Sequence, residues 1–172
     1  IRLSGAETIM GMMPIGPSLI VICSNGVWSI TGGSDYGFSA TNYRVDRISS
    51  FGCVSVSSIV EEKGRVFFWG EDGIYVAAKN QLGDTEVASV TKGVIDSFYQ
   101  DIPIESRVTV AGIHDSFNGS IRWLYTSSDG ATGELILDTT LSCIYPFKIS
   151  YPDPSISVVG VFTTTPFDRV DE

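Results

Sequence analysis

The chain has 172 residues, of which 43% are hydrophobic and 18% are charged, and its formal net charge is −9. The apolar content excludes a disordered chain, and the acidic balance without any run of Lys or Arg excludes a general nucleic-acid-binding surface. No apolar run reaches the roughly 18 residues that a membrane-spanning helix needs, so we expect no membrane contact.

The beginning of the chain and its composition suggest that it belongs to something larger. It starts with Ile1 rather than Met, so we expect a fragment or a cleaved product. The charged fraction is below the usual quarter, which hints that surface is buried against other chains.

The first expected unit is a hairpin near the N-terminus. An apolar run at residues 19–23 is followed by Ser24-Asn25-Gly26 and by a second apolar run at residues 27–30. Asn-Gly between two β-prone runs predicts a tight hairpin, in which these residues accept a positive φ. We expect the preceding stretch, with its methionines and prolines, to complete this unit.

The same pattern recurs twice further along the chain. Residues 65–70 and 74–77 flank a turn ending in Gly73, and a looser copy places a turn around Gly130 between residues 121–126 and 134–138. Gly26 and Gly73 lie 47 residues apart, and Gly73 and Gly130 lie 57 apart. A period of roughly 40 to 50 residues with several strands per unit is typical of β-propeller blades. The sequence therefore predicts an all-β chain of about three antiparallel blades, fewer than the four or more that typically close a propeller.

One short connector helix is expected between the second and third hairpins. Residues 91–100 place apolar side chains on one side, with Thr91 as the N-cap and Pro103 ending the helical region. Residues 107–115 then alternate and predict a strand. We expect blades over residues 1–147, and over residues 148–172 a C-terminal strand or arm that starts a further unit or packs elsewhere.

Six residues are expected to carry the blade architecture. Gly26 and Gly73 belong to hairpin turns, and the aromatic residues lie on or beside strands, where packing between blades buries the most area. Stacking of an exposed tryptophan on a sugar is the alternative. The aromatic members of the set are Trp28, Trp69, Tyr75 and Trp123.

Residues for catalysis, metals and cofactors are sparse. The single histidine, His114, is followed by Asp115, but neighbouring strand residues point to opposite faces. The three cysteines, Cys23, Cys53 and Cys143, form no CxxC pair, so we expect buried free thiols in a reducing compartment rather than a zinc site. The acidic turns lack the alternating oxygen ligands of a calcium loop. We therefore expect no enzyme, no catalytic residue, no metal and no cofactor.

The two clearest hairpins also resemble a protein family. The runs LIVICSNGVWSITGG and FGCVSVSSIVEEKGRVFFWGEDGIYVA are similar to segments of tail nozzle, tail tubular and packaged-DNA stabilisation proteins of tailed bacteriophages, several of which contain a β-propeller. The similarity spans roughly residues 18–147. The positions that match the family's pattern are Gly26, Trp28, Gly32, Gly52, Cys53, Phe67, Asp72, Gly73 and Tyr75.

This resemblance implies a structural role. It implies a virion protein made in the host cytoplasm, located at the tail or head–tail junction as a nozzle or connector component. Its partners would be further copies of itself in a symmetric ring and other tail or connector proteins, with DNA present only as the content of the channel. An acidic wall is compatible with DNA that slides without binding. The alternative is a carbohydrate- or receptor-binding propeller module, and a propeller hydrolase would need converging arginines and carboxylates that the sequence does not assemble.

Overall fold

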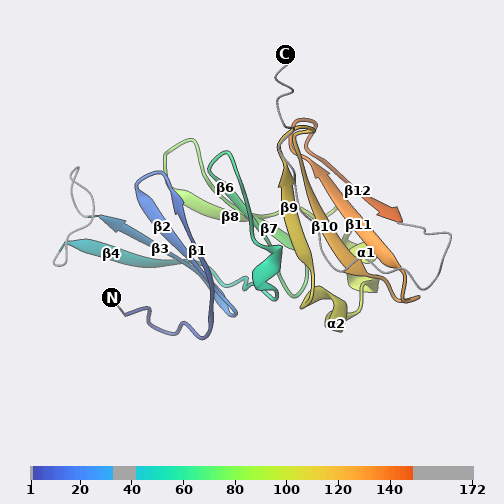
Figure 1. Cartoon of the computed structure of the whole chain (residues 1–172). Helices are drawn as coiled ribbons and strands as arrows, with labels where there is room; N and C mark the ends of the chain where they lie inside the picture. The colour runs from blue at the N-terminus through green and yellow to red at the C-terminus, as the bar shows by residue number, and fades with distance from the viewer. Residues whose placement is uncertain (1, 33–41, 149–172) are drawn as a thin grey trace, which may run out of the picture.

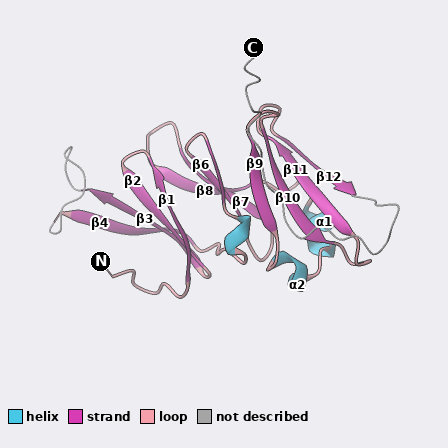
Figure 2. Cartoon of the chain, in the orientation of Figure 1, coloured by secondary structure: helices cyan, strands magenta, loops and turns pink. Residues whose placement is uncertain are grey.

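The computed structural model describes residues 2–32 and 42–148 (Figure 1). Three four-stranded antiparallel sheets account for most of this part, which confirms the all-β class (Figure 2). We name the sheets blade 1, blade 2 and blade 3 in chain order. Blade 1 contains β1 (Ile9–Ile15), β2 (Ser18–Cys23), β3 (Gly26–Gly32) and β4 (Tyr43–Ser49). Blade 2 contains β5 (Val60–Glu62), β6 (Arg65–Trp69), β7 (Ile74–Lys79) and β8 (Thr85–Ser89), and blade 3 contains β9 (Ala111–Asp115), β10 (Ser120–Thr126), β11 (Thr132–Asp138) and β12 (Cys143–Lys148).

Each blade is a simple meander, in which every strand pairs with the next one along the chain. The blades stand side by side in chain order (Figure 1). The first strands β5 and β9 contact each other, as do the last strands β4 and β8. This is the arrangement of consecutive propeller blades, although the described residues do not close a ring.

The three expected hairpins are confirmed, but the expected positive φ is wrong for Gly73, which does not have one. Gly26 pairs with Cys23 and has a positive φ of +158°. A Cβ atom on Gly26 would lie 2.7 Å from the carbonyl oxygen of Ser49, and one on Gly73 would lie 2.5 Å from Oγ1 of Thr91. Close neighbours therefore exclude larger side chains at both positions, whereas Gly130 does have a left-handed φ of +80°.

Two apolar cores join the blades. The core between blades 1 and 2 is built mainly from aliphatic residues with Phe68 and Tyr75, and the core between blades 2 and 3 is built around Trp69 and Trp123. These two indoles meet edge to face, with ring centroids 6.3 Å apart, a favourable geometry for aromatic pairs. Among the described residues no core cluster joins blade 1 to blade 3.

The connection from β4 to β5 binds all three blades. Its residues 53–58, which include the short 3₁₀ turn Val56–Ser58, hydrogen-bond to each blade or its immediate continuation. The bonds run from Cys53 N to Cys23 O (3.0 Å), from Val54 N to Trp69 O (2.9 Å), from Ser55 Oγ to Val110 O (2.8 Å), and from Trp123 Nε1 to Ser58 O (2.9 Å). This connection therefore fixes the blades relative to one another.

The region between β8 and β9 differs from the single helix that the sequence predicts. It contains two short helices, α1 (Asp96–Asp101) and α2 (Ile104–Arg107), and Pro103 separates them. Thr91 is not the N-cap, because its hydroxyl accepts a hydrogen bond from the backbone N–H of Ile74 instead. No helix in residues 2–32 and 42–148 is long and apolar enough to cross a membrane.

The strand expected over residues 107–115 begins only at Ala111. Arg107 belongs to α2, and its buried guanidinium donates to the carbonyl oxygens of Glu71 (2.6 Å), Gln100 (2.9 Å) and Ile102 (2.9 Å). The three hydrogen bonds that the charged guanidinium donates hold Arg107 in α2, and they outweigh the weak strand preference of the neighbouring residues. The expected C-terminal strand or arm over residues 148–172 lies, beyond Lys148, outside the described residues.

Candidate functional site

The three tryptophans are all buried, which determines what they can do. Trp69 and Trp123 lie between blades 2 and 3. Trp28 lies on the face of blade 1 that is turned away from blade 2, beside Leu3 and beneath the guanidinium of Arg47, 5.2 Å from the ring centroid. The expected packing between two blades is therefore confirmed for Trp69 and Trp123. Trp28 instead lies on the outer face of blade 1, at one end of the row of blades. With 2% of its surface exposed at most, none of the three offers a face to a sugar.

Tyr75 is also a core residue. It lies in the core between blades 1 and 2, and its hydroxyl donates to the carboxylate of Asp72 (2.5 Å) at the β6–β7 turn. Burial, followed by the contact with Asp72, raises the pKa of Tyr75. The phenol therefore stays neutral and fixes the turn.

The residues considered for catalysis do not form a reactive group. In the register of β9 and β10, His114 lies opposite Ile121 and Asp115 lies opposite Ser120, so the two side chains occupy opposite faces. The amide of Asn118 donates to Asp115 and lowers its pKa, against the opposing effect of burial. No group of three or more His, Cys, Asp or Glu side chains in the described part is placed to hold a metal ion.

Two of the cysteines are buried as expected, and one is not. Burial raises the pKa of Cys23 and of Cys53, and the Cys53 thiol donates to the carbonyl oxygen of Ser55 (3.1 Å). Cys143, at the start of β12, is exposed, so the expectation of a buried thiol is wrong there. An edge strand covers fewer of its side chains than a central one, which a local apolar run does not reveal.

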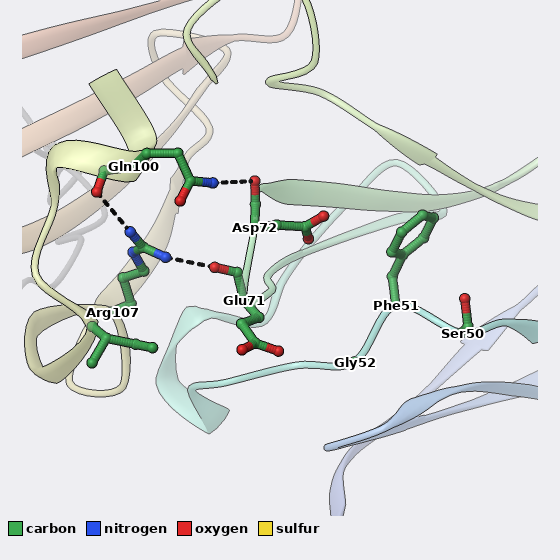
Figure 3. A pocket seen from close by; sticks show the side chains of 8 residues that line it. Ser50, Phe51, Gly52, Glu71, Asp72, Gln100 and Arg107 are labelled. Atoms are coloured by element: carbon green, nitrogen blue, oxygen red, sulfur yellow. Dashed lines mark hydrogen bonds between the residues drawn. The ribbon is translucent and has the colours of Figure 1, made fainter. Parts of the chain in front are cut away.

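A hollow of about 560 Å³ opens beside Arg107 (Figure 3). Its walls come from the β4–β5 connection, the β6–β7 turn and the two helices. Arg107 is 94% buried, lies 5.0 Å from the ring centroid of Tyr99, and ties the helices to the turn, while Gln100 donates to the carbonyl oxygen of Asp72 (3.2 Å). The residues that line the hollow are Ser50, Phe51, Gly52, Glu71, Asp72, Gln100, Ile104 and Arg107. The arginine binds backbone carbonyls and has no carboxylate partner among the described residues, which indicates a structural clamp.

The surface best placed to bind another part of an assembly is the face of blade 3 turned away from blade 2, which we name the end face. Strand register assigns its residues, because side chains on one face of a sheet are aligned across strands. Blade 3 stands at the end of the row, and no further blade follows it within the described residues (Figure 1). The residues of the end face are Ala111, Ile113, Asp115, Ser120, Arg122, Leu124, Thr126, Thr132, Glu134, Ile136, Asp138, Cys143, Tyr145 and Phe147.

A charged residue, Arg122, lies at the centre of the end face, directly between Ile113 and Ile136 on the neighbouring strands. Arg122 lies between two carboxylates, with Nε 3.2 Å from Asp115 Oδ2 and Nη1 3.2 Å from Glu134 Oε1. The contact to Asp115 lacks hydrogen-bond alignment, so Arg122 Nε has no hydrogen-bond partner in the described part, and neither has the buried hydroxyl of Ser120. Buried polar atoms without partners are costly. Both atoms are already covered by the chain itself, so they add to the internal cost of the blade and offer no contact to a partner.

Aromatic side chains extend the end face onto β12. Tyr145 and Phe147 are about half exposed, and register places Tyr145 beside Ile136 and Phe147 beside Glu134. Large exposed apolar side chains gathered on one face are typical of a contact surface. This surface is not among the features that the sequence predicts. The available signal was Arg122, a charged residue inside the apolar run of β10.

The strand edges are less suited to contact than the end face. β12 contains Pro146, which cannot donate to another strand, and β4 carries Arg44, Asp46 and Arg47. Prolines and charges at such positions prevent pairing with another sheet edge. Contact between blades therefore proceeds through faces.

No protein-family model matches the chain, and no curated protein matches it significantly.

Proposed function

We propose that the chain is part of a structural virion protein of a tailed phage. In this role its blades form a rigid section of a ring-shaped wall around the DNA channel, at the tail or at the head–tail junction. The observation that carries the proposal is the end face of blade 3, which presents the half-exposed aromatics Tyr145 and Phe147 at the end of a row of stacked blades. The resemblance of the two hairpins to tail nozzle proteins supports the proposed location.

The packing of the blades supports a mechanical role. Two apolar cores join the blades, and the β4–β5 connection hydrogen-bonds to all three. Arg107 adds a buried clamp between the helices and blade 2. Blades that are joined by these cores and hydrogen bonds form a rigid unit, and rigidity is what a component of the channel wall needs.

The charge of the chain suits a channel that DNA crosses. With a formal net charge of −9, the surface repels phosphates on average. DNA would pass as channel content without specific binding, and we propose no catalytic role, metal or cofactor. The alternative of a glycan-binding module was based on an exposed tryptophan, and Trp28, Trp69 and Trp123 are all buried.

The proposal is tested by quantitative mass spectrometry of gradient-purified particles of the phage that encodes the chain. We expect its peptides at a constant copy number per particle, equal to that of a ring component and unchanged by a high-salt wash. An abundant soluble host protein, which the wash should remove, serves as the washing control. Absence of the chain from particles that still package DNA would refute the proposal.

A further inference from the structure

The hollow beside Arg107 carries an excess of negative charge. Two carboxylates, those of Glu71 and Asp72, and the one guanidinium of Arg107 lie in its walls. Two further exposed acidic residues, Asp101 and Glu105, each follow a lining residue directly in the chain. None of these four carboxylates forms an ion pair within the part of the chain that the structure describes. The hollow therefore favours a cation over an anion.

The positive charge of Arg107 does not reverse this preference. Its nitrogens Nε, Nη1 and Nη2 each donate to a backbone carbonyl oxygen, and its guanidinium lies over the ring of Tyr99. These contacts hold the guanidinium within the fold. The Glu71 carbonyl that binds Arg107 belongs to the backbone, so the Glu71 side chain remains available to a ligand.

An aromatic ring lies beside the carboxylates. Phe51 stacks on Tyr75, with ring centroids 4.4 Å apart and an angle of 16° between the planes, yet 42% of Phe51 is exposed. Tyr75 covers only one face of the Phe51 ring. Figure 3 shows the side chain of Asp72 pointing toward this ring. The Asp72 oxygen Oδ1 accepts from Tyr75, which leaves Oδ2 for another donor.

This combination suits one kind of cation. A guanidinium is planar, is weakly hydrated, stacks on aromatic rings and donates to carboxylates, so a ring next to carboxylates matches an arginine side chain. Ile104 is 51% exposed and offers an apolar wall to the methylene groups of such a side chain. A calcium ion would use neither the ring nor Ile104, and it takes about six to eight oxygen ligands.

The size of the hollow also fits a ligand. Its volume of about 560 Å³ lies within the range of about 300–1,000 Å³ that is typical of ligand pockets. A single arginine side chain with its flanking backbone can therefore enter it.

We propose that the hollow is a docking site for an arginine side chain of a partner protein. The guanidinium lies over the free face of Phe51 and binds the carboxylates of Asp72 and Glu71. The methylene groups of the arginine contact Ile104. Charge complementarity selects a basic side chain as the occupant, and the inference does not depend on the virion role.

NMR titration of the full chain with N-acetylarginine amide tests the proposal. Its uncharged isostere, N-acetylcitrulline amide, has nearly the same shape and is the ligand control. We expect saturable binding of the arginine derivative in the millimolar range, with shifts concentrated on the backbone amides of residues 50–52, 71–72, 100 and 104. The citrulline derivative should bind about tenfold more weakly, because it lacks the charge that the ring and the carboxylates recognise.

Substitutions in the chain locate the binding. Glu71→Gln keeps the backbone carbonyl that binds Arg107 and should weaken binding about threefold. Phe51→Leu keeps an apolar side chain and should weaken binding by a similar factor, about threefold. Glu86→Gln is the matched control, because Glu86 is exposed on β8, does not line the hollow, and loses the same charge.

Thermal unfolding of each variant establishes that it is folded, and Glu71→Gln alone decides the outcome if Phe51→Leu is not. Equal affinity for the arginine and citrulline derivatives would overturn the proposal. So would the absence of saturable shifts, shifts centred away from the hollow, or equal effects of Glu71→Gln and Glu86→Gln.

Discussion

Replacement of Ser58 by alanine is expected to destabilise the chain strongly, although only one oxygen atom is removed. The β5–β6 ladder ends at the pair Val60–Phe67, so the backbone N–H of Trp69 has no strand partner on that side. The hydroxyl of Ser58 takes the place of the missing strand, accepting from Trp69 N (3.0 Å) and donating to the carbonyl oxygen of Ser55 (2.7 Å). Ser58 and Trp69 are both fully buried, so no water replaces the lost partner.

The magnitude follows from these two bonds. A buried N–H left without a partner costs about 1–3 kcal/mol, and loss of the second bond costs about 1 kcal/mol. We expect Ser58→Ala to lower the free energy of unfolding by about 3 kcal/mol, which corresponds to a fall in Tm of about 6–12 °C for a chain of this size. Urea and thermal unfolding followed by tryptophan fluorescence measure both quantities.

Ser120→Ala is the matched control. Ser120 is 4% exposed, so it is buried almost as fully as Ser58, but its hydroxyl has no partner in the described part. Removing an unpaired buried hydroxyl should change stability by less than about 0.5 kcal/mol, or increase it slightly. If the two variants shifted Tm equally, the hydrogen-bonding role assigned to Ser58 would be refuted.

Three further predictions concern buried groups. Glu62 is fully buried, and although burial alone would raise its pKa, hydrogen bonds from Arg65 and a neighbouring lysine lower the pKa overall. The ionised Glu62 carboxylate therefore stabilises the fold fully at pH values above about 4.3, the pKa of a glutamate in the unfolded chain. This stabilisation is lost as the pH falls through the lower pKa that Glu62 has in the folded chain. The stability gap between the wild type and Glu62→Gln should then shrink between pH 7 and pH 3, and a constant gap would contradict this. Arg107→Lys should cost about 3 kcal/mol in urea unfolding, because an ammonium cannot reach all three carbonyls, and a cost below 1 kcal/mol would argue against the clamp. Gly112→Ala should cost about 1–3 kcal/mol by overpacking against Trp123, and wild-type stability would show that the strands can separate.

The hairpins could be predicted because their information is local. Asn25-Gly26 and Asp72-Gly73 each stand between two apolar runs, and the same residues that make the turn also set the register. The short strand β5 was missed because it has only three residues, two of them glutamates, and Glu62 is nevertheless buried, paired with Arg65, Lys63 and the distant Thr139.

Long-range contacts explain the remaining errors. Arg107 lies in a segment that alternates like a strand, but carbonyls from α1 and from the β6–β7 turn hold it in α2. For the end face the sequence holds one signal, the charged Arg122 within the apolar run of β10, but not the partners of that residue. The end face brings Asp115, Arg122 and Glu134 together from three strands, and no local pattern reveals that pairing.

The most direct test of the proposed role is a cryo-EM reconstruction of the particle that contains this chain. We predict a symmetric ring around the DNA channel in which each subunit shows three stacked four-stranded sheets, with the end face of blade 3 buried. Density that places the chain outside any ring, with Tyr145 and Phe147 in solvent, would contradict the account.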